Sequence, residues 1–67
     1  MQEVSMFTKL IEASKTHLTK GAYQLVYDET HELVQVVHKR NGEVNYEICS
    51  DGDEMLMATI IYFGLKN

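Results

Sequence analysis

The chain has 67 residues and a mass of 7.7 kDa, which is enough for one small domain, expected to span residues 1–67. Ten acidic and six basic residues give a formal net charge of -4, and this balance argues against direct binding of nucleic acid through a basic surface. Apolar residues make up 45% of the sequence, which excludes an intrinsically disordered chain.

A chain this short has little room for a hydrophobic core of its own. A domain of about 60 residues buries only about 60% of the surface that its unfolded chain exposes. The single cysteine, Cys49, excludes an intrachain disulfide. We therefore expect association, with a second copy of the chain or with another protein, to add to its stability.

Two segments bear on where the protein resides. Residues 1–10 contain Glu3 and Lys9 and no apolar run of about seven or more, so no signal peptide is expected. The longest charge-free apolar stretch, residues 55–65, is too short for a helix that crosses a bilayer, which needs about 20 residues. Together with the unpaired cysteine, these features predict a cytoplasmic protein without membrane contacts.

A helix is predicted over residues 2–19. Apolar residues recur there at the spacing of one helical face: Val4, Phe7, Leu10, Ile11 and Leu18. Gly21 follows, at a position where a glycine commonly ends a helix.

Three strands are predicted next as an antiparallel meander, over residues 23–27, 33–39 and 44–50. Asn41-Gly42 lies between the second and the third strand. This pair is a strong signal for a two-residue hairpin turn, because both positions require a positive φ. With these two residues as the loop, Val37 lies opposite Tyr46, and the rest of the register follows.

The two faces of this hairpin differ in composition. The more apolar face is predicted to be the core side, and it carries Leu33, Val37, Val44, Tyr46 and Ile48. The other face is predicted to be open to solvent, and it carries Val34, Val36, His38, Asn45, Glu47 and Cys49. An odd length of the loop before the second strand places Tyr23, Leu25 and Tyr27 on the predicted core face, and an even length places them on the predicted solvent face. The larger apolar area of Tyr23, Leu25 and Tyr27 favours placing these three in the core.

A second helix is predicted over residues 52–65, with Asp51 or Ser50 as its N-cap. Two apolar stripes lie on roughly opposite sides of it: Leu56, Ile60 and Phe63 on one, and Met57, Ile61 and Leu65 on the other. A helix that is apolar around most of its circumference is buried on more than one side. The expected fold is therefore α+β in the order α-β-β-β-α, a three-stranded antiparallel meander with two helices packed on one face. The second stripe of this helix is expected to be covered by a partner.

No arrangement of residues predicts catalysis or a bound cofactor. No two of the histidines, His17, His31 and His38, have the i, i+4 spacing of a metal pair on a helix. Acidic residues surround Cys49, and they raise the pKa of a thiol and weaken it as a nucleophile. The sequence contains no phosphate-binding loop, dinucleotide-binding fingerprint or nucleophile elbow. The protein is expected not to be an enzyme and to bind no metal or cofactor.

The predicted order of elements matches that of double-stranded-RNA-binding domains, but those domains need basic residues at the start of the second helix. Here that position holds Asp51, Asp53 and Glu54, so RNA binding is rejected. The element order and the acidic charge are similar to those of some small phage-encoded inhibitors, including certain anti-CRISPR proteins. That resemblance implies an inhibitor that presents carboxylates in place of nucleic-acid phosphates.

Three functions are compatible with these features. The first is a small non-enzymatic interaction domain that binds a protein partner or itself through its C-terminal helix and the sheet face predicted to be exposed to solvent, with these contact residues: Met57, Ile61, Tyr62, Leu65, Val34 and Val36. The second is an acidic inhibitor of a nucleic-acid-handling enzyme, with these carboxylates as the mimic: Asp28, Glu29, Glu32, Glu47, Asp51, Asp53 and Glu54. The third is a structural homodimer.

Overall fold

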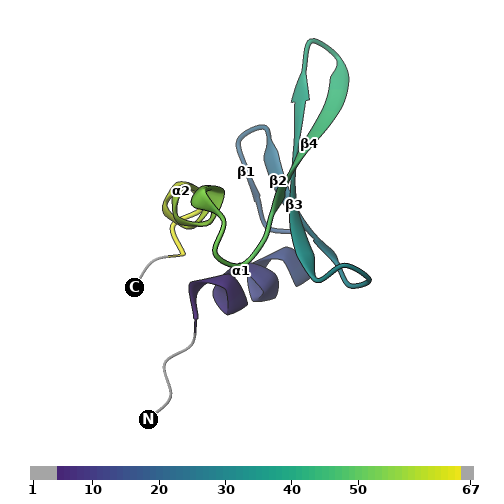
Figure 1. Ribbon diagram of the computed structural model, residues 1–67. Helices are drawn as coiled ribbons and strands as arrows, with labels where there is room; N and C mark the ends of the chain where they lie inside the picture. The colour runs from purple at the N-terminus through teal and green to yellow at the C-terminus, as the bar shows by residue number, and fades with distance from the viewer. Residues whose placement is uncertain (1–4, 66–67) are drawn as a thin grey trace.

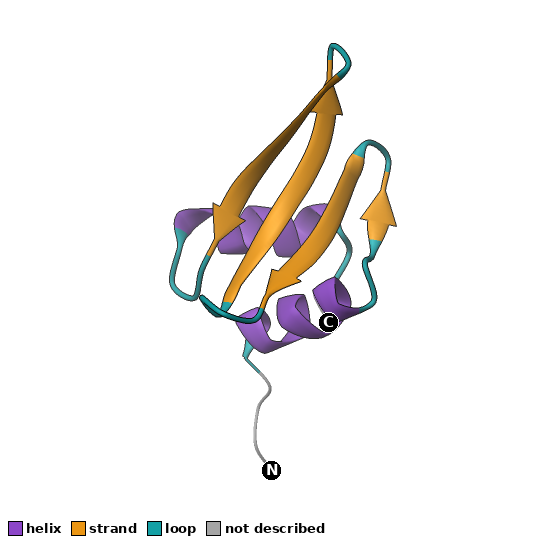
Figure 2. Cartoon of the chain, turned by 90° about the vertical axis from the view of Figure 1, so that its right-hand side faces the viewer, coloured by secondary structure: helices purple, strands orange, loops and turns teal. Residues whose placement is uncertain are grey.

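The computed structural model describes residues 5–65 and shows two helices on one side of a four-stranded antiparallel sheet (Figures 1 and 2). The elements follow in the order α1 (Met6–Lys15), β1 (Thr19–Lys20), β2 (Tyr23–Asp28), β3 (Leu33–Arg40), β4 (Glu43–Cys49) and α2 (Glu54–Tyr62). Each strand pairs with the next one in the chain, so the sheet order is β1-β2-β3-β4. The α+β class is as predicted, but the sheet has four strands where three were predicted.

α1 begins where a serine caps it. Ser5 lies just before the helix, and its Oγ accepts a hydrogen bond from the backbone N–H of Thr8 at 3.1 Å. Residues 2–4 of the predicted helix, among them Val4, lie outside the described residues. Leu10 is fully buried, so the predicted apolar face of this helix is the one that packs.

α1 ends earlier than predicted, at Lys15, and Gly21 does not terminate it. His17 adopts the left-handed conformation, with a φ of 56°. The backbone N–H of Leu18 then donates to the carbonyl of Ala13 at 3.2 Å, which completes a Schellman motif. The next residues pair with the start of β2 as the short strand β1. Gly21 instead supplies the positive φ, 61°, that the turn between β1 and β2 requires.

β3 and β4 form the hairpin predicted from Asn41-Gly42. The two turn residues have φ values of 54° and 79°, as a type I′ turn requires. The register is the predicted one, with Val37 opposite Tyr46. The hairpin extends beyond both helices as a two-stranded arm, so its outer end has no helix beneath it (Figure 1).

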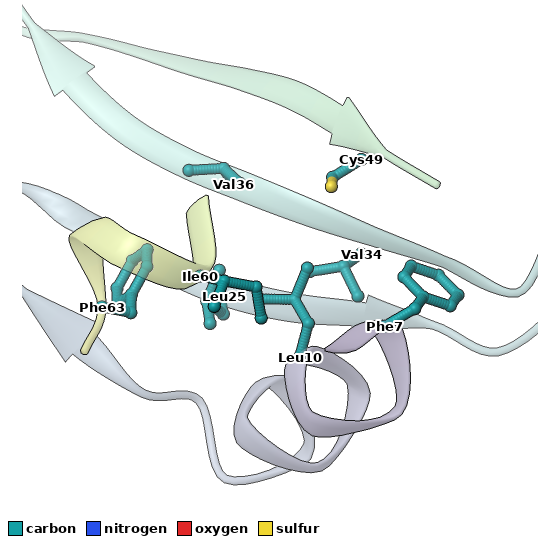
Figure 3. Packing of buried hydrophobic residues seen from close by; sticks show 8 residues of the cluster. All are labelled: Phe7, Leu10, Leu25, Val34, Val36, Cys49, Ile60 and Phe63. Atoms are coloured by element: carbon teal, nitrogen blue, oxygen red, sulfur yellow. The ribbon is translucent and has the colours of Figure 1, made fainter. Parts of the chain in front are cut away.

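The hydrophobic core lies between the two helices and one face of the sheet. It consists of buried apolar residues from both helices, the C-cap of α2 and three strands: Phe7, Leu10, Leu25, Val34, Val36, Cys49, Ile60 and Phe63 (Figure 3). The hairpin residues in this cluster come from the face that was predicted to be open to solvent, so the predicted facing of the hairpin is wrong. The face predicted to be the core side is the uncovered one.

The loop between β2 and β3 decides which side chains share the core face. Residues 29–32 give this loop an even length, so Leu25 pairs with Val36 and lies on the same face. Tyr23, Leu25 and Tyr27 thus face the helices, so they do lie on the core side, as predicted. The odd loop length on which that prediction depended is wrong, and these residues share the core face with Val34 and Val36, not with Val37 and Tyr46.

α2 is shorter than predicted at both ends. Its N-cap is Asp53, not the predicted Asp51 or Ser50, and the Asp53 Oδ1 accepts a hydrogen bond from the backbone N–H of Met55 at 3.1 Å. At the other end, Gly64 adopts a φ of 70° and stops the helix. α2 starts only a few residues after β4, which places it against the sheet face that carries the core.

Candidate interaction surface

The sheet face that points away from the helices is apolar and uncovered. We define this open face by its apolar side chains, which are Val26, Leu33, Val37, Val44, Tyr46 and Ile48. Val44, Tyr46 and Ile48 are 62%, 63% and 47% exposed. Contiguous apolar patches of more than a few hundred Å² are rare on proteins that act alone, and they mark places where another molecule binds. The more apolar face of the hairpin is therefore exposed to solvent.

Cross-strand pairing arranges the side chains of the open face in rows. Tyr46 lies opposite Val37. Ile48 lies opposite Gln35, which pairs in turn with Val26. Because successive side chains in a strand alternate between faces, every second residue of β4 lines this surface.

A second apolar area lies on the outer side of α2. Met57 and Ile61 are 44% and 59% exposed. Leu65, predicted to lie in the same stripe, is half-buried and packs against the core. The apolar area on α2 is thus smaller than predicted.

Tyr62, another predicted contact residue, already has partners within the chain. The centroid of its ring lies 5.2 Å from that of Tyr23, in an edge-on arrangement. The Lys20 ammonium lies 5.1 Å from the Tyr62 ring centroid and donates a hydrogen bond to the Tyr62 carbonyl at 2.7 Å. The Tyr62 hydroxyl donates to the Lys20 carbonyl at 3.4 Å. Tyr62 therefore holds the turn between β1 and β2 against the end of α2.

Val34 and Val36 do not belong to an exposed surface. They are 0% and 5% exposed, so their predicted role in partner contact is wrong, and the error follows from the wrong facing of the hairpin. A shallow depression of about 290 Å³ lies between α2 and the sheet, and its lining includes Val36, Glu47 and Tyr62. Its volume is at the lower limit of sites that enclose a small molecule.

The predicted acidic residues gather at one end of the sheet, with one exception. The loop after β2 and the segment that leads into α2 lie at this end and carry Asp28, Glu29, Glu32, Asp51, Asp53 and Glu54. Glu32 and Asp51 both line a second depression, which lies at this end of the sheet. The exception is Glu47, whose register position puts it on the helix side of β4.

Two of these carboxylates stabilise local structure. Asp28 accepts hydrogen bonds from the backbone N–H groups of Thr30 and His31 at 3.1 and 3.3 Å. Its Oδ2 also lies 2.8 Å from Nδ1 of His31, and this side-chain hydrogen bond is the main cause that lowers the pKa of Asp28. Asp53 caps α2. The exposed carboxylates at this end without such a role are Glu29, Glu32, Asp51 and Glu54.

Cys49, at the end of β4, is buried in the core and carries a free thiol. Burial raises the pKa of this thiol, and the nearby Asp53 carboxylate raises it further, while the Thr59 hydroxyl acts in the opposite direction. The thiol is therefore a poor nucleophile near neutral pH. Within residues 5–65, no three histidine, cysteine or acidic side chains gather closely enough to hold a metal ion. No helix in that part of the chain has the length and apolar character needed to cross a membrane.

The surface is interpreted from its own geometry, because no family model, curated protein or solved structure matches the chain. The residues that sequence reasoning missed as surface are those of the open face, which it placed in the core. The two faces are distinguished by their rows of cross-strand neighbours, each row made of one residue from β2, one from β3 and one from β4. Each such row on the open face contains a glutamine, Gln24 or Gln35, whereas the helix face has the row Tyr27, Val34 and Cys49 without one.

Proposed function

We propose that this protein is a small non-enzymatic interaction domain that binds a protein partner through its open face. The observation that carries the proposal is the exposure of Val44 and Tyr46, at 62% and 63%, on the more apolar face of the hairpin. Burial of apolar surface is the main favourable term in most protein associations. A tyrosine adds a large contact area with a polar tip that can stay hydrated.

The proposal includes a location and a second, smaller contact area. A reducing compartment such as the cytoplasm suits a chain whose one cysteine is free and buried. Met57 and Ile61, on the outer side of α2, are exposed enough to serve as the helical contact expected from the sequence. α2 lies behind the sheet as seen from its open face, so the two contributions can be separated by mutation (Figure 2).

Capture from lysate of the source cell, with nuclease added, tests the proposal. The pair Val44→Thr and Ile48→Thr removes apolar surface from the open face and keeps branched side chains in the strand. The pair Met57→Gln and Ile61→Gln makes the matched change on α2. We expect a partner, identified by mass spectrometry, whose recovery falls at least about tenfold with the first pair and changes less than about twofold with the second. A partner lost only with the α2 pair, or with neither, would contradict binding through the open face.

The carboxylates at one end of the sheet favour a second candidate function, an acidic inhibitor of a nucleic-acid-handling enzyme. Glu29, Glu32 and Asp51 are exposed there within two neighbouring loops. A partner held by these charges is lost at high salt, whereas apolar docking depends little on salt. The pair Glu29→Lys and Glu32→Lys abolishes binding by such a mimic and leaves open-face binding nearly unchanged. A salt-resistant partner that tolerates this pair supports the open face and excludes the mimic.

A further inference from the structure

β4 forms a long edge of the sheet that no described strand covers. It has seven residues, and no described strand lies beyond it (Figure 2). The opposite edge is the two-residue strand β1. Proteins usually shorten such edges, place charges on them, interrupt them with a bulge or proline, or cover them, because an unpaired edge is a template for another strand. β4 contains no proline and pairs with β3 without a break, and its charges, Glu43 and Glu47, lie on the helix side of the strand.

We propose that a second copy of this chain pairs with this edge, β4 against β4 and antiparallel, around a two-fold axis at Tyr46. This inference rests on the proposed function in one respect, since it names the second copy as one protein that the domain binds. The two sheets then join into one, and the two open faces become a single surface of twice the width. The proposed partner-binding surface is therefore completed by the second copy.

The backbone of β4 fits this arrangement. In a two-residue hairpin, the residues that flank the turn exchange backbone hydrogen bonds, and bonded pairs alternate along the strands from there. Arg40 and Glu43 flank the turn, so Val44, Tyr46 and Ile48 direct their backbone groups away from β3. An axis at Tyr46 pairs this residue with itself and Val44 with Ile48 of the second copy. Outward backbone groups then meet outward groups along the whole strand.

Charge selects this register over its neighbours. With the axis at Tyr46, Glu47 lies opposite Asn45 of the second copy. With the axis at Asn45, Glu43 lies opposite Glu47 of the second copy. With the axis at Glu47, this carboxylate lies opposite itself. Like charges directly opposite each other destabilise a strand pair, so only the Tyr46 axis pairs all of β4 and avoids them.

Site-specific cross-linking tests the register. Tyr46→Cys places two thiols opposite each other, where Cα atoms of a bonded antiparallel pair lie about 5.5 Å apart and a disulfide can form. Val44→Cys is the matched control, because its two copies lie roughly 13 Å apart along the strands. The unchanged protein, with only the buried Cys49, gives the background. Mild oxidation is expected to link the Tyr46→Cys variant alone. Equal linkage of both variants, or of neither, overturns the proposal.

Charge substitutions test the same contact without oxidation. Asn45→Lys places a cation opposite Glu47 of the second copy, and Asn45→Glu places a like charge there. By light scattering over a concentration series, we expect the first to tighten and the second to weaken the dimer by about tenfold each. The same two substitutions at Gln24, two strands away, are expected to change the affinity less than about twofold. An unchanged protein that stays monomeric at a concentration on the order of 1 mM overturns the proposal.

The dimer and the proposed function can be disproved independently of each other. A monomer whose partner capture depends on Val44 and Ile48 overturns the edge-to-edge dimer alone. A dimer with the Tyr46 register but no partner that depends on the open face overturns the proposed function alone.

Discussion

One face of the sheet is covered by both helices, and the other is covered by no part of the described chain (Figures 1 and 2). On the helix side, Leu25, Val34 and Cys49 are each 0% exposed. On the open side, Tyr46 is 63% exposed although it is larger than any of them. Apolar composition of the hairpin therefore does not decide which face is buried.

The difference between the faces lies in how the apolar residues are grouped. Tyr27, Val34 and Cys49 form an unbroken apolar row across three strands at the end of the sheet nearest the helices. The matching rows on the open face are interrupted by Gln24 and Gln35, and that face continues along the arm beyond the helices. A compact apolar group that the helices can reach forms the core, and the more extended group remains exposed.

The largest expected effect comes from the same substitution made on both faces. Val34→Thr buries a hydroxyl among apolar side chains and is expected to lower the free energy of unfolding by about 1–3 kcal/mol. Val44→Thr replaces an exposed side chain with another good strand former and is expected to change it by less than about 0.5 kcal/mol. Urea denaturation measures both. Equal losses at the two positions would contradict the assignment of the two faces.

Two turn glycines offer a second comparison, between the region packed by helices and the free arm. Gly42→Ala forces a methyl group into a positive φ, 79°, with no atom within 4 Å of it, and is expected to cost about 1 kcal/mol through the backbone alone. Gly21→Ala also brings its Cβ to 3.2 Å from the Tyr62 hydroxyl, so a larger loss is expected. Thermal unfolding of the two variants shows which substitution lowers the stability more. A smaller loss at Gly21 would show that Tyr62 does not hold that turn.

The hairpin was the most predictable part of the fold. Asn41-Gly42 has few alternatives to a type I′ turn, so the turn and the register from Arg40–Glu43 onward follow from local chemistry. The end of α1 was not predictable in the same way, because His17 occupies a left-handed position where a glycine is usual. Once the helix stops there, the residues after it are free to pair as β1.

The facing of the sheet required information from outside the hairpin. A comparison of two strands favours the side with Tyr46 and Ile48 as the core. Adding β2 to the comparison makes the other side the core, because the even loop before β3 places Leu25 and Tyr27 on that side. Helix faces were predicted better, since the exposure of Met57 and Ile61 follows from the helical period alone.

Asp28, at the end of the open face, gives the smallest expected effect. The hydrogen bond from His31 lowers the pKa of Asp28 below its ordinary value of 3.8. Its carboxylate therefore stabilises the fold above pH 3.8, and this contribution is lost as the pH falls through the lowered pKa. Asp28→Asn removes the charge, so the urea midpoints of the two proteins are expected to differ slightly at about pH 7 and to converge at about pH 2. A difference that is the same at both pH values would contradict this coupling.

The measurement that most directly tests the account is the accessibility of methyl groups on the two faces of the sheet. A neutral, soluble paramagnetic probe is added to protein with labelled valine and isoleucine methyl groups, and line broadening is measured by NMR. Strong broadening is predicted for Val44 and Ile48 and little for Val34 and Val36. Edge-to-edge pairing leaves the open face exposed, so this prediction holds for a monomer and for the proposed dimer. The reverse pattern, with Val44 and Ile48 protected and Val34 and Val36 broadened, would contradict the account.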